Sequence, residues 1–592
     1  MRHWMESEFN SYDGETLFYR YTKPVTNSKK ALLFLHRGHE HSGRIIPFAN
    51  KLSEDDHWCF AFDMRGHGLS GGRRAWADNF DAWVRDLNSF AGHIRQTFGI
   101  EINNTILVAN SVGAVMAVRW ILNYGANLRG CILGAPAFSI KLYIPFALPL
   151  LRLARRISRD LFVTSYVRSS LLTRDEKEAL SYDTDPLITN KIGVNVLVTL
   201  FDAVRNCFAR LRDFEVPVLI FTAEKDYIVR NKHHALFYKH ISSTLKKHIL
   251  LKDFRHAIFH EKDQHLILEP SRKFVNNLFE EDSKQLPATI PLACTHTVQE
   301  FQKLYNTGSL PKQIYYSIFR RLFEKLGQYS NGISIGLQFG FDSGVSLDYV
   351  YKNKPAGQNT FGRLIDRIYL NSVGWQGIRK RKQHLIEALM AVSNELSKNS
   401  KQPVIFDAAS GPGRYLFEIQ QQLDYPIQLY LNDEDKTCIE HAQQIAAHYK
   451  SNTTAFFNQN VFDDFKSRMF STTPNIIIIS GLFELYDNNG QVHQVINNLY
   501  SLLDEGGYLI YTGQPWHPQM ELIGRLLNNR LGQRWVMRRR IQREMDGLVE
   551  SAGFTKLSTE SDDFGIFTVS CAYKQNTHYY KERDDGRIQQ RA

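Results

Sequence analysis

The 592-residue sequence lacks any long hydrophobic run. A membrane-spanning helix needs about 20 consecutive apolar residues. The longest apolar stretch, LYIPFALPLL at 142–151, is much shorter and contains two prolines. We therefore expect no spanning helix. The N-terminal stretch MRHWMESEFNSYDGE has neither an apolar core nor a cleavage site, so we expect no signal peptide.

Cysteine is also scarce, with six residues and no CxxC spacing among them. This scatter fits reduced cytosolic thiols better than a disulfide framework or a zinc site, so we expect no metal. Positive charge, in contrast, is in excess: the net charge is +11. That excess favours anionic partners, namely a phospholipid surface, nucleic acid or an anionic metabolite. The length indicates more than one domain.

Two regions alternate short apolar runs with amphipathic segments, which is typical of a parallel sheet covered by helices. The first runs from about 30 to 135, through ALLFLH, HWCFAFD, TILVAN and GCILGAP, and resumes at VPVLIFTAEKD. Between these parts the pattern is helical. The second region begins at QPVIFDAASGPG and continues to FTVSCAYK. The fold class is therefore predicted to be α/β in both halves.

The loss of periodicity over 280–300 indicates a connector between the halves. The predicted organisation is a first domain at 1–285 with an insertion at about 138–212, a linker at 286–309, a helical prelude at 310–398, a second domain at 399–574 and a polar tail at 575–592.

A serine stands where the buried strand TILVAN gives way to a helical pattern: it is Ser111, with the small residues Ala109 and Gly113 on either side. Such a strand–serine–helix turn is typical of the nucleophile elbow of an α/β-hydrolase. The turn exposes the hydroxyl, and backbone N–H groups at the helix start can stabilise an oxyanion. The alternative is a serine that only caps a buried helix.

An acid and a histidine follow in the order that this chemistry requires, Ser, Asp, His. Asp226 stands just after the strand VPVLIFT, and His256 follows the next apolar run. Glu224 and His260 are rivals within a few residues. His256 is preferred because it comes first after its strand and turn, whereas His260 would fall on the following helix.

The segments LFLHRGHEHSGR, FDMRGHGLSGG, ANSVGA, LTRDEKEALSYDTDPL, AEKDYIV and RHAIFHE, in this order, resemble the monoacylglycerol lipase and lysophospholipase branch of the α/β-hydrolases, often labelled serine aminopeptidase-like. The resemblance covers about 10–280. It implies an α/β-hydrolase fold with Ser111 as nucleophile, His256 as base and Asp226 as its orienting acid.

By the same resemblance, the N–H groups of Gly38 and Val112 form the oxyanion hole, and the insertion at 138–212 is a cap over the acyl pocket. The family usually has glycines where this chain has Arg37 and His39. Two interpretations stay open for them: a site for an anionic headgroup, which arginine binds bidentately, or charge on the surface of the loop.

The cap segment KLYIPFALPLLRLARRISRDLF, at 141–162, mixes apolar residues with four arginines, Arg152, Arg155, Arg156 and Arg159. A basic amphipathic helix can lie on an anionic bilayer. The alternative is an ordinary cap helix that faces its own pocket.

A second candidate site lies in VIFDAASGPGRYLFEI, at 404–419, a strand, a glycine-bearing turn and a helix. Asp407 ends the strand in the pattern DxAxGxGR, which differs from the dinucleotide pattern GxGxxG. A carboxylate there would repel a pyrophosphate but suits a ligand with an amino group and a sulfonium. The next strand ends at Asp433, where an acid can accept hydrogen bonds from ribose hydroxyls. The alternative for Asp433 is a helix N-cap.

The segments DAASGPG, LYLNDED, FNQNVFDD, NIIIISGLFEL, LLDEGGYLIYTGQP and FTVSCAYK resemble a class I S-adenosylmethionine-dependent methyltransferase with a Rossmann-like fold, whose last strand is antiparallel. The resemblance implies S-adenosyl-L-methionine as cofactor. It assigns Asp407, Ala409, Gly411 and Gly413 to the methionine-side loop, Asp433 to the ribose and Asn460 to the position near the adenine.

The fourth strand is followed by SGLFEL rather than D/N-P-P-Y, which disfavours methylation of nucleobase amino groups, and we assign no catalytic base. Basic stretches at 374–385 and 534–545 could bind phosphate or form solvated helix faces. Nucleic acid is not an expected partner.

The whole chain resembles bacterial fusions of a hydrolase with a methyltransferase. We expect a bifunctional cytoplasmic enzyme acting on lipid or acyl-ester metabolites, with peripheral contact with an anionic inner membrane face as a further expectation. Two alternatives remain: a methyltransferase directed at RNA or a small molecule, with a hydrolase-fold binding module, and an acyltransferase that uses the serine triad. The sequence does not indicate the oligomeric state.

Overall fold

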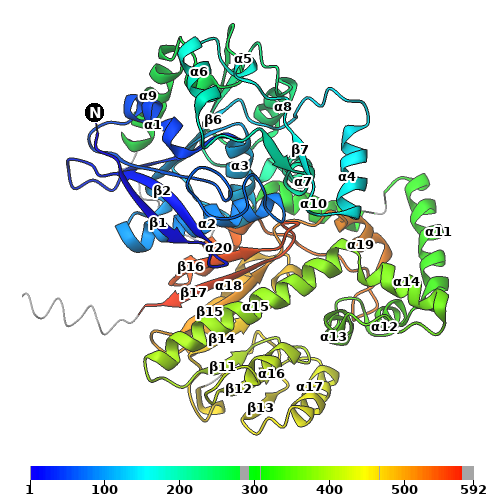
Figure 1. Ribbon diagram of the computed structural model, residues 1–592. Coiled ribbons are helices and arrows are strands. Elements are labelled where there is room, and N and C mark those ends of the chain that lie inside the picture. Colours follow the sequence, from blue (N-terminus) through cyan, green and yellow to red (C-terminus); the bar gives the residue numbers. More distant parts are fainter. Residues whose placement is uncertain (1, 281–292, 307, 464, 466, 576–592) are drawn as a thin grey trace, which may run out of the picture. The chain divides into compact units, whose positions relative to one another are not determined.

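The computed structural model describes residues 2–280, 293–306, 308–463, 465 and 467–575. It divides into two compact units, Met1–Leu286 and Pro287–Ala592 (Figure 1). The polar tail predicted at 575–592 lies outside the described residues, apart from its first residue.

Unit 1 contains an eight-stranded sheet in the order β1-β2-β4-β3-β5-β6-β9-β10. Strand β2 pairs antiparallel with β1 and β4, and the other neighbours are parallel. This is the α/β-hydrolase fold that the sequence predicts. The strands are β1 (Met5–Asn10), β2 (Thr16–Thr22), β3 (Ala31–Leu35), β4 (Trp58–Phe62), β5 (Thr105–Asn110), β6 (Gly130–Gly134), β9 (Val218–Ala223) and β10 (Lys246–Leu251).

Helices cover both faces of this sheet, so β3, β5, β6 and β9 are buried along their whole length. Because side chains alternate along a strand, Leu33 and Leu35 join one core while Leu32 and Phe34 join the other. The first core is covered by α2 (Phe80–Phe98), α3 (Val112–Tyr124) and α8 (Lys232–His240), and the second by α1 (Ser42–Leu52) and α9 (His265–Glu280).

The insertion between β6 and β9 contains a short antiparallel strand pair as well as helices. The sequence pattern predicts helices alone there, because strands of three residues are too short to show an alternation. Helix α7 packs into the main core, whereas α4 has no buried residue. The elements are α4 (Ala147–Ile157), β7 (Phe162–Thr164), α5 (Ser169–Leu172), α6 (Glu176–Thr184), β8 (Lys191–Gly193) and α7 (Val194–Ala209).

Unit 2 contains a seven-stranded sheet in the order β13-β12-β11-β14-β15-β17-β16. All neighbours are parallel except β17, which is antiparallel to β15 and β16. This arrangement confirms the Rossmann-like prediction with a reversed last strand. The strands are β11 (Val404–Asp407), β12 (Gln428–Asn432), β13 (Thr454–Phe457), β14 (Ile476–Ile479), β15 (Tyr508–Gly513), β16 (Phe554–Ser561) and β17 (Thr568–Lys574).

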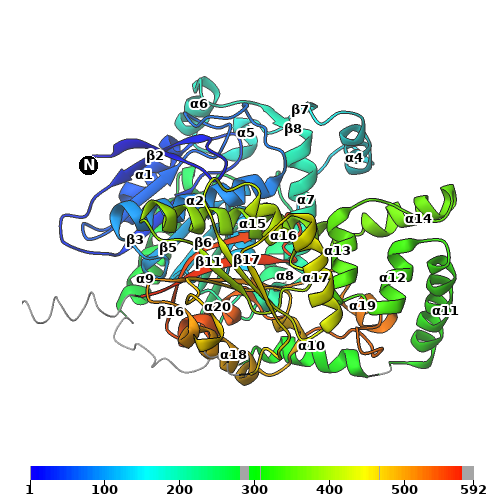
Figure 2. The same ribbon diagram turned by 90° about the horizontal axis from the view of Figure 1, so that it is seen from below.

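Two helical layers enclose the second sheet, as Figure 2 shows from below. One layer consists of α15 (Val373–Lys398), α16 (Arg414–Gln420) and α17 (Lys436–His448). The other contains α18 (Asn489–Leu502) and α20 (Gln542–Ser551).

The helical prelude belongs to unit 2 and extends beyond its predicted start. The prediction of a linker over 286–309 is wrong for 295–305, because these residues form α10 (Thr295–Tyr305). Leu304 of α10 is buried, and Glu300 accepts a hydrogen bond of 2.7 Å from Arg539. The remaining elements are α11 (Leu310–Gly327), α12 (Asn331–Phe339), α13 (Gly344–Lys352), α14 (Thr360–Leu370) and α19 (Met520–Leu526).

Within the described ranges, no helix is both long enough and apolar enough to cross a bilayer.

Candidate active sites

Ser111 lies at the turn between β5 and α3 in a backbone conformation that is rare for a side-chain-bearing residue, with φ 54° and ψ −113°. Conformations of this kind persist only where the surroundings impose them. The turn is tight: a Cβ on Gly113 would lie 2.6 Å from the carbonyl oxygen of His36. The small neighbour is therefore required, and it keeps the serine at the tip of the turn.

The structure brings Ser111, His256 and Asp226 together in one buried chain of hydrogen bonds. His256 Nε2 lies 2.8 Å from Ser111 Oγ, and His256 Nδ1 lies 2.8 Å from Asp226 Oδ2. Asp226 Oδ1 accepts hydrogen bonds of 2.8 Å from the N–H groups of Ile228 and Val229. In this arrangement the imidazole can take the serine proton while the carboxylate stabilises the imidazolium that forms.

The charge of Asp226 is secured by its neighbours. Burial alone would raise the pKa of this carboxyl, but the attraction of His256 and the hydrogen bonds from His256, Val229 and Ile228 lower the pKa below its ordinary value. The acid can therefore stay ionised beside the imidazole.

The two alternative residues, His260 and Glu224, are not part of this chain of hydrogen bonds. His260 Nδ1 faces Glu178 at 3.4 Å. Glu224 is exposed and accepts a hydrogen bond of 3.0 Å from the backbone N–H of Asp253. Asp226 and His256 follow β9 and β10 after short turns, and the hydrogen bonds between them, rather than distance from the strand, separate them from Glu224 and His260.

The predicted oxyanion-hole residues are adjacent. A Cβ on Gly38 would lie 3.4 Å from Val112 Cγ2, and both residues line the same cavity as Ser111. This cavity measures about 500 Å³. Its walls are mostly apolar and come largely from the insertion that was predicted to be the cap, including Leu142, Leu150, Leu151, Val163, Ile192 and Leu197.

Arg37 is 3% exposed, so the interpretation of it as surface charge is wrong. Its Nη2 donates a hydrogen bond of 2.6 Å to Glu40, and its guanidinium lies 5.0 Å from the centre of the Tyr182 ring. Its charge is thus balanced inside the protein. Burial, with Arg37 adding to it, lowers the pKa of His39 to about 4, so this imidazole is neutral at pH 7.

In unit 2, the loop after β11 forms a second candidate site. Asp407, Ala409, Gly411, Gly413 and Asp433 all line one cavity. Gly411 and Gly413 have φ values of 53° and 62°, in the left-handed region that favours glycine. Asp433 Oδ2 accepts a hydrogen bond of 2.8 Å from the N–H of Gly411.

Asn460 is the one predicted cofactor residue that the structure does not place in this cavity. Its side chain is exposed and donates a hydrogen bond of 2.6 Å to Glu434 Oε2. The amide is therefore engaged at the surface, and the predicted adenine contact has no support from its position.

The acids of this cavity lack a full set of balancing charges. Burial raises the pKa of Asp407 to about 7, and the nearby Asp433 adds to the rise, although hydrogen bonds from Tyr415 and Ala409 oppose it. Burial also raises the pKa of Asp433. Such a cavity favours a cationic ligand, which would stabilise the ionised carboxylates.

The prelude supplies cavity residues that the sequence did not assign to this site, among them Gly344, Tyr351 and Arg381, the last of which lies in the basic stretch at 374–385. A Cβ on Gly344 would lie 3.1 Å from Gly411 Cα, so α13 begins directly against the glycine loop. Arg381 is 3% exposed, and within the described part of the chain its Nε–H has no hydrogen-bond partner. No local pattern places these residues at the glycine loop, because they precede Gly411 by between 30 and 67 positions and only the fold brings them to it.

The interpretation of 534–545 as a solvated helix face is wrong for its three central arginines. Arg538, Arg539 and Arg540 are 1%, 6% and 4% exposed. Arg538 donates a hydrogen bond of 3.0 Å to Glu544, and Arg540 donates one of 2.7 Å to the carbonyl oxygen of Phe483. These groups stabilise the fold of unit 2 and present no open phosphate site.

The fold and the two sites define a protein with an α/β-hydrolase domain and a methyltransferase-like domain, and comparison with known proteins agrees. Residues 26–263 match the family described as serine aminopeptidase S33. Residues 271–574, more than half of the chain, match the family described as putative methyltransferase. The chain belongs to this putative methyltransferase family and carries the hydrolase domain in addition.

Relatives extend the comparison to the whole chain. The Escherichia coli K12 protein named "Uncharacterized protein YnbC" is 36% identical over 577 residues, which is 96% of this chain and 98% of the relative. Human monoglyceride lipase is 29% identical over 268 residues, covering 42% of this chain and 86% of the lipase. A crystal structure of a soluble variant of Saccharomyces cerevisiae monoglyceride lipase is 18% identical, covers 46% of this chain and 94% of that one, and has a TM-score of 0.42.

The raised pKa of Asp407 predicts a pH dependence of stability. The carboxyl releases its proton near pH 4 in the unfolded chain but near pH 7 in the folded one. Because the folded state holds the proton more tightly, the free energy of unfolding should decrease as the pH rises from about 4 to about 7, by at most about 4 kcal/mol. Asp407→Asn should remove this slope, measured as the unfolding midpoint of the full-length protein from pH 4.5 to 7.5. Asp424→Asn, an exposed change in the same unit, is the control, and parallel curves for wild type and Asp407→Asn would contradict the assignment.

Proposed function

We propose that the protein is a bifunctional enzyme, a serine hydrolase of acyl esters joined to an S-adenosylmethionine-dependent methyltransferase. The observation that carries the hydrolase proposal is the chain Asp226–His256–Ser111, which ends at an apolar cavity of about 500 Å³. Pockets of this size and character hold small apolar ligands.

The hydrolase step follows from the positions of the groups. His256 Nε2 takes the proton of Ser111 as Oγ attacks the ester carbonyl carbon. The N–H groups of Gly38 and Val112 would receive the oxyanion. His256 then returns the proton to the leaving alcohol, and water releases the acyl group by the same sequence in reverse. The apolar cavity wall favours an acyl chain over a peptide. The likeness to human monoglyceride lipase supports an ester substrate.

An acyltransferase would use the same acyl-enzyme and differ only in the alcohol that accepts the acyl group. A non-catalytic binding module has less support, because both hydrogen bonds of the triad are present, one between His256 Nδ1 and Asp226 and one between His256 Nε2 and Ser111.

The first prediction from this proposal concerns the nucleophile. A fluorophosphonate probe should label the wild type and leave Ser111→Ala unlabelled. Turnover of a monoacylglycerol should drop on the order of 10⁴-fold or more in His256→Ala. His260→Ala serves as the matched control and should retain labelling. Equal labelling of wild type and Ser111→Ala would refute the assignment.

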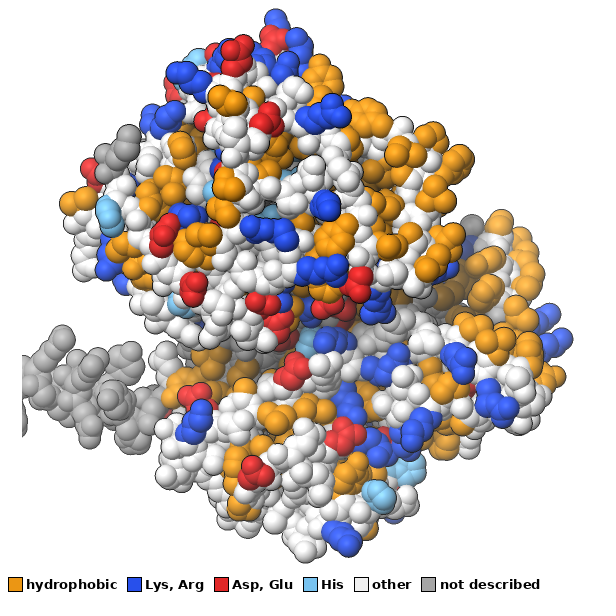
Figure 3. All heavy atoms as spheres, in the orientation of Figure 1, with side chains coloured by type: hydrophobic (Ala, Val, Ile, Leu, Met, Phe, Trp, Pro, Cys, Tyr) orange, Lys and Arg blue, Asp and Glu red, His pale blue; other side chains and the backbone are white. Residues whose placement is uncertain are grey.

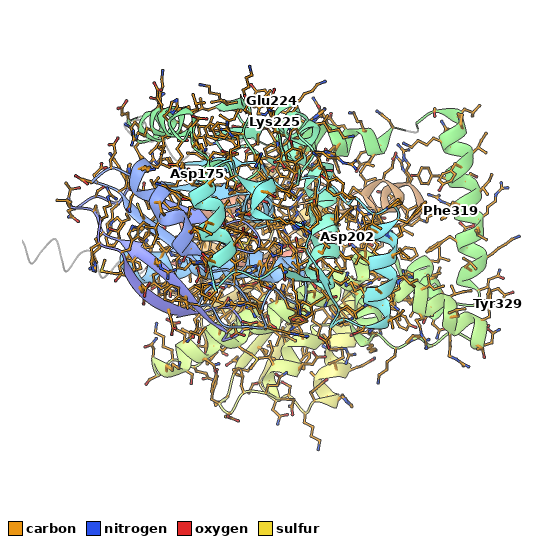
Figure 4. All side chains as sticks on the ribbon, turned by 45° about the horizontal axis from the view of Figure 1, so that its top comes forward. Asp175, Asp202, Glu224, Lys225, Phe319 and Tyr329 are labelled. Atoms are coloured by element: carbon orange, nitrogen blue, oxygen red, sulfur yellow. The ribbon has the colours of Figure 1, made fainter. Side chains whose placement is uncertain are left out.

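We further propose that α4 contacts an anionic membrane. Leu153 and Ile157 are 56% and 81% exposed. Hydrophobic side chains gather over α4 on the face shown in Figure 3. Arg152 and Arg155 lie on the same helix, and Arg152 donates a hydrogen bond of 2.6 Å to Asp202 of α7, which Figure 4 labels. Exposed apolar side chains among arginines suit the boundary of an anionic bilayer.

Changing the apolar side chains should weaken this contact. The double variant Leu153→Glu/Ile157→Glu should co-sediment less with phosphatidylglycerol-containing vesicles than the wild type, because two exposed apolar side chains that would enter the bilayer become charged. Its hydrolysis of a soluble short-chain ester should stay unchanged, since neither residue lines the cavity. Leu236→Glu, at an exposed leucine of α8, is the control. Equal sedimentation of all three proteins would exclude α4 as the contact.

The methyltransferase proposal depends on whether the residues of the second cavity fit the cofactor. Asp407 suits an amino group, Asp433 suits ribose hydroxyls, and the unpartnered Nε–H of Arg381 suits a carboxylate. The left-handed glycines allow the backbone to approach a ligand closely. When bound, the cofactor supplies an electrophilic methyl group. The donor set therefore fits S-adenosylmethionine, and the membership of the putative methyltransferase family supports a methyl donor.

The cavity around these residues measures about 90 Å³, whereas small-molecule sites usually exceed about 300 Å³. The proposal therefore requires α13, whose Gly344 lies against Gly411, to move aside when the cofactor binds. An RNA-directed enzyme has less support, because the arginines at 538–540 are buried.

The cofactor assignment predicts a specific loss of affinity. Asp433→Ala should weaken binding of S-adenosylhomocysteine to the full-length protein about tenfold to a thousandfold, because charged hydrogen bonds are worth roughly 1.5–3 kcal/mol each. Gly411→Val should weaken it further, since a branched side chain is strained at positive φ. Isothermal titration, run beside NAD and FAD, measures both, with Asp424→Ala as control. Heat with NAD alone would mean that the loop binds a dinucleotide instead.

A further inference from the structure

Unit 2 contains a second, larger cavity beside the proposed cofactor site. It measures about 290 Å³ and shares five lining residues with the smaller cavity, namely Asp342, Leu347, Arg381, Gly481 and Leu485. The segments after β14 and β15 contribute to it, at the carboxyl ends of parallel strands where ligands bind in open α/β sheets. A ligand here would lie next to the proposed methyl donor.

The wall of this cavity is apolar over most of its extent. It is built by α11, α14, α15 and α19, with Leu326, Ile365, Ile378 and Leu522 among the contributing side chains. Trp375 and Trp535 also line it, with ring centroids 6.3 Å apart. An apolar wall of this kind selects a ligand with a hydrocarbon body. Figure 4 shows α11 on the outer side of this helical wall, with Phe319 labelled in the middle of the helix and Tyr329 just after its last residue.

Polar groups gather at one part of the cavity. Glu484, which follows β14, is 9% exposed and faces Arg381, with Nη1 3.8 Å from Oε1. Among the described residues, none donates a hydrogen bond to the Glu484 carboxylate. The carboxylate therefore keeps its accepting capacity for a ligand.

His517 and Gln514 can donate to the same ligand. Burial lowers the pKa of His517 to about 4, so its imidazole is neutral at pH 7. His517 Nδ1 accepts a hydrogen bond of 3.0 Å from the N–H of Gln519, which leaves the proton on Nε2. Gln514 Nε2 is buried and has no hydrogen-bond partner in the described part of the protein. Both lie on the segment after β15.

The charges at this end disfavour an anionic ligand. Glu484 lines the apolar cavity but not the smaller one, whereas Arg381 lines both. With Arg381 turned to a carboxylate of the cofactor, as proposed above, the apolar cavity retains the negative charge of Glu484. A carboxylate ligand would meet that charge in a poorly hydrated space, while a hydroxyl or ammonium would donate a hydrogen bond to it.

We propose that this cavity is the methyl-acceptor site and that it takes a single-chain amphiphile whose head is a hydroxyl or amine, with Glu484 receiving the hydrogen bond from the nucleophile. The proposal deepens the proposed methyltransferase function and rests on it. In the transfer, the bond from the nucleophile to the methyl carbon forms as the carbon–sulfur bond of the sulfonium donor breaks toward sulfur. The proton that the nucleophile releases passes to the Glu484 carboxylate.

Tryptophan fluorescence can test the binding claim in the full-length protein without turnover. A chain that carries bromine, 10-bromo-1-decanol, should quench the indoles that line the cavity. Trp83 lines the hydrolase cavity, which can also take a hydrocarbon chain, so the test starts from the Trp83→Phe variant. The quenching should remain in Trp83→Phe and be lost when Trp375→Phe and Trp535→Phe are added to it. Quenching that survives the loss of Trp375 and Trp535 would overturn the site.

Competition then tests the chemistry of the head. At pH 8, decanol and decylamine should displace the probe, and decanoate should be at least about tenfold weaker, because charged hydrogen bonds are worth a factor of this order. In Glu484→Gln, the ratio between the concentrations of decanoate and decylamine that displace half of the probe should shrink by at least about tenfold. Equal displacement by decanoate and decanol in the wild type would overturn the proposed head preference.

The two proposals can fail separately. Glu484→Gln should still bind S-adenosylhomocysteine, since Glu484 does not line the smaller cavity and the variant leaves Arg381 in place. Chain binding of the expected selectivity without any S-adenosylhomocysteine binding would keep the lipid site and reject the cofactor. The converse result would keep the cofactor and reject the acceptor.

Discussion

The turn that follows a fully buried parallel strand is the constraint on which both sites depend. A buried strand cannot itself expose reactive groups, so the chain presents them where the strand ends. In unit 1 this turn holds Ser111 at φ 54°, and in unit 2 it holds Gly411 and Gly413 at φ 53° and 62°. The difference in residue type follows from the use proposed for each turn. A nucleophile needs a side chain and accepts backbone strain, whereas a loop that approaches a ligand needs no Cβ.

The same constraint explains what the sequence could predict. Alternating buried runs predicted both sheets. Polar residues at or shortly after the ends of strands marked the candidate site residues Ser111, Asp226, His256, Asp407 and Asp433. These are local patterns, and each remains visible without knowledge of the fold. The sequence did not predict α10 or the short strand pair β7–β8, because these elements have too few buried positions to produce a periodicity.

Buried charge was the other failure, because the residues that neutralise it are often distant in sequence. Arg539 pairs with Glu300, and Arg414 pairs with Asp348. Such partners are far away in the sequence, so the sequence alone does not show that these arginines are paired. Arg37 is a milder case: Glu40 is only three positions away, but the burial that makes the pair matter comes from the whole domain. Asn460 failed differently, since its place along the chain was plausible while its amide is bound to Glu434 at the surface.

The two sites also differ in how far the protein alone completes them. In the proposed hydrolase site, each member of the triad has its partner within the chain, so the hydrogen-bonded geometry is complete in the protein alone. In unit 2, the Arg381 Nε–H and Gln514 Nε2 are buried without hydrogen-bond partners in the described residues, and the pKa of Asp407 is raised by burial. Such groups cost free energy in the unliganded protein, and a ligand that satisfies them recovers that cost. Ligands should therefore stabilise the folded state of unit 2 through these groups, as expected for any molecule that binds only the native state. The geometry of the first site is thus set by folding, whereas the second site leaves polar groups that a ligand would satisfy.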